Sequence, residues 1–304
     1  MTEVVGIGAA LFDILMTADS FPNEDTKLQS RESKVQGGGP CATALVAMAK
    51  LGVQSAYMGT LGDDMYGSFI CRAFDTYGVD RSKVRIVPGA RSFHSFVLLN
   101  VKDATRTCVW NKGTVTPPEA QDVDIQILKN AKYLHLDGNQ LECAIYAAQK
   151  AREFGVIVSL DAGGAYPGIE RLLPFVDVLI PSEEFARKVT GCETAEEAAE
   201  KLWSAYHPQT LIVTQGNRGG FIWEEGKAVR YPVFPVKAVD SNGAGDTFHG
   251  AFVAARVKGM SVPEAARFAS ATSALKCTRF GAQEGIPGYE EVLTFMKDNP
   301  GIII

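Results

Sequence analysis

The stretch DSNGAGDTFHGAF, residues 240–252, indicates the fold and most of the chemistry expected of this chain. The Gly-Ala-Gly run at 243–245 stands directly before a segment in which Phe248 and Phe252 keep helical spacing. Small residues at the start of a helix let backbone N–H groups approach an anion closely, and the helix dipole favours negative charge there. The pattern therefore predicts an anion-binding turn at the N-terminus of a helix.

Asp246 lies just inside this predicted anion site. A carboxylate beside a phosphate cradle is electrostatically unfavourable unless it performs a task, and the obvious task is to accept a proton from a hydroxyl that attacks phosphorus. The alternative interpretation is that Asp246 only stabilises the first helical turn, where acidic residues are common. His249 follows on the same helix, and we interpret it as a packed or solvated side chain rather than a catalytic one.

Three further glycine clusters mark turns near the expected site. Gly37–Gly38–Gly39–Pro40 opens a helix, because proline fits the first helical position, and Thr43 follows one turn later. This cluster is either a ligand-approach turn or an ordinary tight turn. Residues 62–67 form a second cluster, in which an aspartate alternatively caps the next helix. Residues 214–220 form a third, just after a strand, where ligands lie in doubly wound folds.

Short β-rich runs alternate with amphipathic helical segments along most of the chain. The expected strands cover 4–8, 53–59, 132–136, 156–160, 176–180 and 210–214, and the expected helices cover 40–51, 66–77, 140–154 and 183–190. This rhythm predicts an α/β fold, a three-layer αβα sandwich with a mostly parallel central sheet. We interpret the apolar run from Val4 to Met16 as a buried first strand.

Two segments interrupt this rhythm and predict a small protruding β-lid, at about 14–36 and 91–112. The second reads as two alternating strands around a polar turn at 102–105, and a further hairpin is expected at 221–234. Residues 1–304 contain neither a low-complexity linker nor an internal repeat. We therefore expect one domain with an appended lid.

Composition excludes several classes of protein. The chain has 304 residues and a formal net charge of −5, with lysine and arginine spread evenly, so we expect neither a nucleic-acid nor a membrane partner. The six cysteines form no CxxC pair, which disfavours zinc and disulfide scaffolds. No apolar stretch of about 18 residues is present to span a membrane, and we expect a cytoplasmic protein. The motifs GxxxxGK[ST], GxGxxG, GxSxG and HExxH are absent.

Together these segments resemble the ribokinase (PfkB) family of carbohydrate kinases over nearly the whole chain. Residues 240–252 resemble the second signature of that family, D[TS]xGAGDxFxGA. Residues 37–52, GGGPCATALVAMAKLG, followed by GTLGDDMYG at 59–67, resemble the first. The closest likeness is to the ketohexokinase-like and sulfofructose kinase branch, through GGGP, SEEF at 182–185 and KCTR…GIP at 276–287.

The resemblance implies roles for individual residues. Asp246 resembles the base that deprotonates the acceptor hydroxyl, and the backbone of Gly243, Ala244 and Gly245 resembles the anion hole. The implied substrate-binding residues are Asp13, Lys27, Gly38, Gly39, Thr43, Asn111 and Asn139. The implied nucleotide-binding residues are Ser182, Thr214, Gly216, Gly219, Cys277 and Gly281. ATP and Mg²⁺ are the implied cofactors, with K⁺ as a further candidate: Asp240 and Asn242 are implied for a monovalent cation, and Glu183 for Mg²⁺ through water.

Three departures from the family pattern are visible. Thr43 replaces the asparagine of the first signature, Asn242 stands where threonine is usual, and SEEF replaces the NxxE motif. An arginine expected near Asn139 in sulfofructose kinases is also absent, which disfavours a dedicated sulfonate pocket.

The leading hypothesis is an ATP-dependent kinase for a primary hydroxyl of a small sugar, a ketose or pentose such as fructose or ribose. The alternatives are a kinase for an anionic ketose, a nucleoside kinase, and a sugar- or nucleotide-sensing binding protein. Lids of this kind pair between two chains in the family, so a homodimer is a further expectation.

Overall fold

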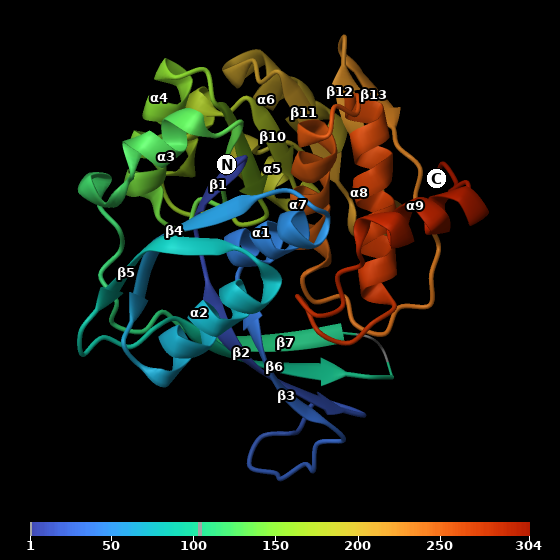
Figure 1. Ribbon diagram of the computed structural model, residues 1–304. Helices are drawn as coiled ribbons and strands as arrows, with labels where there is room; N and C mark the ends of the chain where they lie inside the picture. The colour runs from blue at the N-terminus through green and yellow to red at the C-terminus, as the bar shows by residue number, and fades with distance from the viewer. Residues whose placement is uncertain (1, 103–104) are drawn as a thin grey trace.

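The computed structural model describes residues 2–102 and 105–304, and its centre is a nine-stranded sheet (Figure 1). The strand order is β13-β12-β11-β10-β9-β8-β1-β4-β5. Pairing is parallel from β11 to β5 and antiparallel for β12 and β13, so the hairpin expected at 221–234 extends the edge of this sheet. The strands are β1 (Val4–Ile7), β4 (Ser55–Gly62), β5 (Asp80–Val87), β8 (Tyr133–Leu136), β9 (Ile157–Ala162), β10 (Val178–Pro181), β11 (Thr210–Thr214), β12 (Gly220–Glu224) and β13 (Lys227–Arg230).

Helices cover both faces of the sheet, and each face has its own apolar core. Successive side chains of a strand point to opposite faces, so Val4 joins one core while Val5 and Ile7 join the other. On the first face lie α1 (Pro40–Lys50), α2 (Met65–Tyr77), α7 (Ala244–Val257), α8 (Val262–Cys277) and α9 (Tyr289–Asp298). On the second lie α3 (Ile125–Asn130), α4 (Leu141–Glu153), α5 (Glu183–Thr190) and α6 (Ala195–Tyr206). The predicted three-layer α/β fold is confirmed.

Helix ends follow the local sequence signals. Pro40 occupies the first turn of α1, and Gly78 ends α2 in the left-handed conformation. Thr194 and Glu197 form the expected capping box of α6. Short 3₁₀ helices occur at Ala120–Asp122, Ile169–Arg171, Leu173–Phe175 and Gly216–Arg218. Within the described part of the chain, no helix has the length and apolar character that a membrane crossing requires.

A second, four-stranded sheet protrudes from the first and forms the predicted lid (Figure 1). Its order is β3-β2-β6-β7, with β3 (Ser33–Gly38), β2 (Leu11–Ala18), β6 (His94–Asn100) and β7 (Thr105–Asn111). The two alternating strands expected at 91–112 are present. Positions 103–104 of the expected turn lie outside the described residues.

The interpretation of Val4–Met16 as one strand is wrong. The chain leaves the central sheet after Ile7 and enters the lid at Leu11. The Asp137 carboxylate occupies the break: its Oδ2 accepts the backbone N–H of Ala9 at 2.7 Å, and a Cβ on Gly8 would lie 2.5 Å from it. The break places Asp13 in the lid sheet rather than at the end of the first strand.

Candidate active site

The N-terminal turn of α7 forms one wall of a cavity of about 440 Å³. Gly243 caps the helix with a left-handed φ of 76°, which glycine adopts without steric cost. Asp246 follows in the first turn, half-buried, and lines the same cavity. The first N–H groups of a helix have no partner within it, so this turn presents both donors and a carboxylate to the cavity.

Asp13 lines the cavity from the lid sheet and is buried. The Ser95 hydroxyl donates to its Oδ1. A Cβ on Gly38 would collide with Asp13 Oδ2, and a Cβ on Gly39 would collide with the carbonyl oxygen of Ala9. Glycines 38 and 39 are therefore required for the close approach of the lid strands to this carboxylate.

Both carboxyl groups titrate near neutrality. Burial raises the pKa of Asp246 to about 6, while the charge of Arg106 lowers it and the charge of Asp137 raises it. Burial likewise raises the pKa of Asp13 to about 6; the bond from Ser95 lowers it and the charge of Asp246 raises it. Two acids perturbed in this way inside one cavity are typical of a site that moves a proton.

A second cavity of about 520 Å³ meets the first at the same turn. Ser241, Ala244 and Gly245 line both cavities. The second cavity is otherwise mostly apolar, with Phe234 and Phe248 in its wall. Four residues predicted to bind nucleotide line it: Thr214, Gly216, Gly219 and Cys277. The two cavities and the shared turn form a site in which a group can pass from one bound molecule to another.

The family model of the pfkB family carbohydrate kinases matches residues 1–288 of this chain. The chain belongs to the pfkB family of carbohydrate kinases. It is 31% identical to a ribokinase of Haemophilus influenzae, over 96% of this chain and 97% of that protein. It is 28% identical to the ATP-dependent ribose-1-phosphate kinase of Halopiger xanaduensis, over 98% of this chain and 99% of that protein.

The solved structure of Arabidopsis thaliana ribokinase, complexed with ribose and ATP, has the same fold. It superposes with a TM-score of 0.86 at 29% identity, over 98% of this chain and 99% of that one. This pfkB-family protein is therefore an ATP-dependent carbohydrate kinase, and its fold is that of the ribokinases.

The structure places several predicted substrate residues away from the sugar cavity. Lys27 is exposed in the segment before β3. Asn111 lies opposite His94 on the outer face of the lid sheet, because it is one residue beyond Trp110, which lines the cavity. Asn139 donates from its Nδ2 to the hydroxyl of Tyr166 at 3.0 Å, so it positions a lining residue instead. Thr43 is fully buried beside Gly243, behind the turn.

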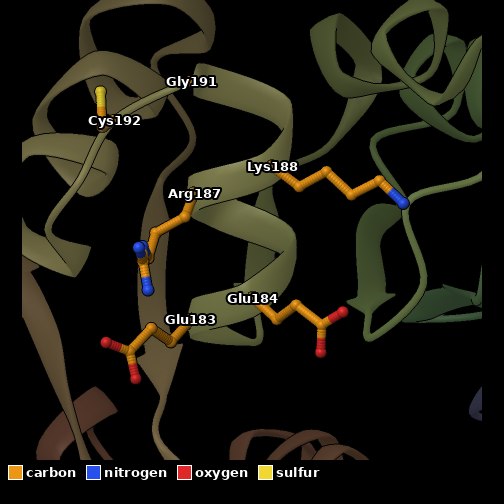
Figure 2. A pocket seen from close by; sticks show the side chains of 6 residues that line it. All are labelled: Glu183, Glu184, Arg187, Lys188, Gly191 and Cys192. Atoms are coloured by element: carbon orange, nitrogen blue, oxygen red, sulfur yellow. The ribbon is translucent and has the colours of Figure 1, made fainter.

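Three predicted nucleotide and metal residues have structural partners. The Ser182 hydroxyl caps α5 by accepting the N–H of Phe185 at 3.1 Å. Gly281 donates its N–H to Asp240 Oδ2 at 2.9 Å. Glu183 forms an ion pair with Arg218, and Figure 2 shows its carboxylate at the N-terminal end of α5, beside Glu184. Asn242 lines the sugar cavity.

Sequence reasoning missed four lining residues: Asp137, Asp161, Tyr166 and Arg106. Asp137 and Asp161 stand at the carboxyl ends of β8 and β9, the edge of a parallel sheet where ligands bind, so the strand positions were a usable signal. Arg106 shares one face of β7 with Cys108 and Trp110 because alternate residues of a strand point the same way. Its sequence position gave no comparable signal.

Proposed function

We propose that this kinase transfers the γ-phosphoryl group of ATP to a primary hydroxyl of a small neutral sugar, a ketose or pentose such as fructose or ribose. The observation that carries the proposal is the position of Asp246 beside the turn that both cavities share. The sugar occupies the smaller, polar cavity and the nucleotide the larger, more apolar one. Asp246 accepts the hydroxyl proton, and the N–H groups of 243–245 stabilise charge on the phosphoryl group in transit.

The remaining predicted residues divide between the two cavities in this proposal. Asp13 accepts hydrogen bonds from sugar hydroxyls, and Gly38 and Gly39 shape that wall. Thr214, Gly216, Gly219 and Cys277 contact the nucleotide. Residues 1–304 act as one kinase domain in which the lid sheet excludes water that would otherwise accept the phosphoryl group.

Mg²⁺ fits this site as an ion held mainly by nucleotide phosphates and water. Across residues 2–102 and 105–304, no cluster of three or more His, Cys, Asp or Glu side chains could hold a metal ion. Mg²⁺ usually keeps several waters and takes one or two carboxylates plus substrate phosphates. Glu183 remains the candidate for contact through water, and Mg²⁺ would neutralise phosphate charge during transfer. For K⁺ the candidates remain Asp240 and Asn242; Asp240 already binds Lys276 Nζ through its carbonyl oxygen at 2.8 Å.

The experiment that tests the proposal is a coupled ADP-release screen over pentoses, hexoses, ketose phosphates, a sulfonated ketose and nucleosides. We expect turnover with a neutral ketose or pentose. Turnover confined to nucleosides, or sugar-induced thermal stabilisation without any ADP release, would contradict the proposal and favour a nucleoside kinase or a sensing protein.

One observation favours an anionic ketose as a second candidate substrate. Arg106 projects from the lid into the sugar cavity, and its charge reaches Asp246. Among the described residues, Arg106 has no salt bridge. A guanidinium in such a position suits a phosphate or sulfonate substituent. The ketose phosphates and the sulfonated ketose in the screen test this candidate directly.

The raised pKa of Asp246 predicts the pH profile of the kinase. A base works only when ionised, so a pKa of about 6 places the loss of activity well above the range of an ordinary carboxyl. We expect kcat/KM to be level above about pH 7 and to fall about tenfold per pH unit below the pKa. Protonation of Asp13, whose pKa is also about 6, steepens the fall. Initial rates between pH 4.5 and 8.5 check this; a midpoint near pH 4 would contradict it.

For the quaternary structure, we propose a homodimer formed through the outer face of the lid sheet. The register places one apolar side chain of each strand in a continuous row, Val35, Ile14, Phe96 and Val109. Val35, Phe96 and Val109 are 48%, 37% and 67% exposed. A second copy presents the same row, so a two-fold axis can bury both.

Substitution of this row predicts a change of assembly. We expect the double variant Phe96→Lys/Val109→Lys to be monomeric, because its like charges would face each other across the interface. Val229→Lys is the matched control, since Val229 is an exposed valine of β13 on the main sheet. Light scattering after size-exclusion chromatography measures the mass. A monomeric parent protein, or a double variant that stays dimeric, would overturn the proposal.

A further inference from the structure

Asp161 is the one carboxylate of the sugar cavity that an α7 histidine holds. It stands at the carboxyl end of β9 and is 5% exposed. Its Oδ1 lies 3.1 Å from His249 Nε2 and accepts the N–H of Gly163 at 3.0 Å. Two donors therefore converge on one oxygen of this carboxylate.

The other oxygen of Asp161 is differently placed. Within the described part of the chain, Oδ2 has no hydrogen-bond partner, although Asp161 lines the cavity. Asp137 differs, because backbone N–H groups of Ala9, Cys41 and Asn139 occupy both of its oxygens. A buried carboxylate needs hydrogen-bond donors, so Oδ2 requires one from a bound molecule.

His249 does not reach the cavity itself. It is 4% exposed, lies three residues after Asp246 on α7, and is not among the residues lining the cavity. Burial and the neighbouring ring of His135 lower its pKa well below the usual value, so the ring is neutral. A neutral ring with its proton on Nε2 donates to Asp161 Oδ1 and fixes the carboxylate.

We propose that Asp161 binds a second hydroxyl of the sugar through Oδ2, and that His249 is the positioning residue that aims this oxygen at the cavity. The inference rests on the proposed function. It adds that the substrate class is a polyol with a hydroxyl donor besides the one that is phosphorylated. The charge of Asp246 acts strongly on Asp161, so the two hydroxyl groups lie on neighbouring parts of the sugar.

The variant Asp161→Asn tests the role of Oδ2 with little change of shape. The two donors at Oδ1 keep the amide oxygen on their side, so the amide NH₂ replaces Oδ2 and turns an acceptor into a donor. The probes are D-ribose with its 2-deoxy and 3-deoxy analogues, and D-fructose with its 3-deoxy and 4-deoxy analogues. We expect the parent kinase to lose about 10–100-fold in kcat/KM with one deoxy analogue, and Asp161→Asn to lose this discrimination.

Variants of His249 test the positioning role. His249→Leu removes the donor, and we expect it to lower the same discrimination, whereas His249→Gln keeps a neutral N–H near the Nε2 position and restores it. The double variant Asp161→Asn/His249→Leu is expected to show no further loss, because the two residues act on one hydrogen bond. His135→Leu is the matched control: His135 is a fully buried neighbour, its ring 6.4 Å from that of His249, and it should leave the discrimination unchanged.

Two further measurements separate the outcomes. Unchanged affinity for ADP in each variant shows that the fold and the nucleotide cavity are intact. Retention of the parent discrimination by Asp161→Asn overturns the inference while leaving the proposed function in place. Equal effects of His135→Leu and His249→Leu overturn the positioning role. Absence of turnover by the parent protein with every ribose and fructose probe overturns the proposed function itself.

Discussion

Replacing Asp246 by asparagine is expected to lower kcat by about 10²–10⁴-fold, the usual loss when a general base is removed. Asparagine keeps the size of the side chain and cannot accept the hydroxyl proton. The KM for sugar should change little, because the proton moves only as the transition state forms. The measurement is sugar-dependent ADP release with the best substrate of the screen.

Stability provides the control for this experiment. Burial raises the pKa of Asp246, so the ionised side chain is less stable inside the protein than in water. A neutral amide removes this cost, and the melting temperature of Asp246→Asn should equal or exceed that of the parent. Asp63→Asn is a matched variant, since Asp63 is an exposed aspartate that accepts the N–H of Gly89 at 2.9 Å. An Asp246→Asn rate within about tenfold of the parent would disprove the assigned base.

The catalytic turn was predictable from the sequence because all of its determinants are local. Glycine at 243 permits the left-handed cap, small residues leave the N–H groups accessible, and Asp246 follows in the same turn. The alternation of strand and helix patterns likewise gave the three layers, because each pattern reports which face of an element is buried. Residues close in sequence and related by one period are placed correctly by such reasoning.

The rest of the sugar cavity depends on distances that local patterns do not contain. A shift of one residue along a strand reverses the face of a side chain, so Trp110 lines the cavity while Asn111 points outward. The division of Val4–Met16 into two strands depends on Asp137, which is distant in sequence and holds Ala9. Asp161 and His249, which come from different layers, meet only through the packing of α7 on the sheet.

The largest effect on stability is expected from Asp240→Asn. Asp240 and Lys276 are both fully buried beneath the turn of α7, with Lys276 Nζ 2.8 Å from the Asp240 carbonyl oxygen and 3.9 Å from Oδ2. The carboxylate also accepts the N–H of Asn242 on Oδ1 at 2.8 Å and that of Gly281 on Oδ2 at 2.9 Å. An amide would place its own N–H against one of these donors and leave the ammonium without its counter-charge.

Removing one partner of a buried ion pair typically costs about 3–5 kcal/mol, and we expect Asp240→Asn to lower the free energy of unfolding by this amount. Glu284→Gln is the matched control, because Glu284 pairs with Lys34 at the surface and its side chain is 64% exposed. An exposed pair contributes about 0–1 kcal/mol, so water should compensate this loss. Urea unfolding followed by circular dichroism measures both variants. If they prove equally stable, the Asp240–Lys276 pair does not hold the loop that carries the anion-binding turn, and the rigidity of that turn must come from the glycine cap and helix packing alone.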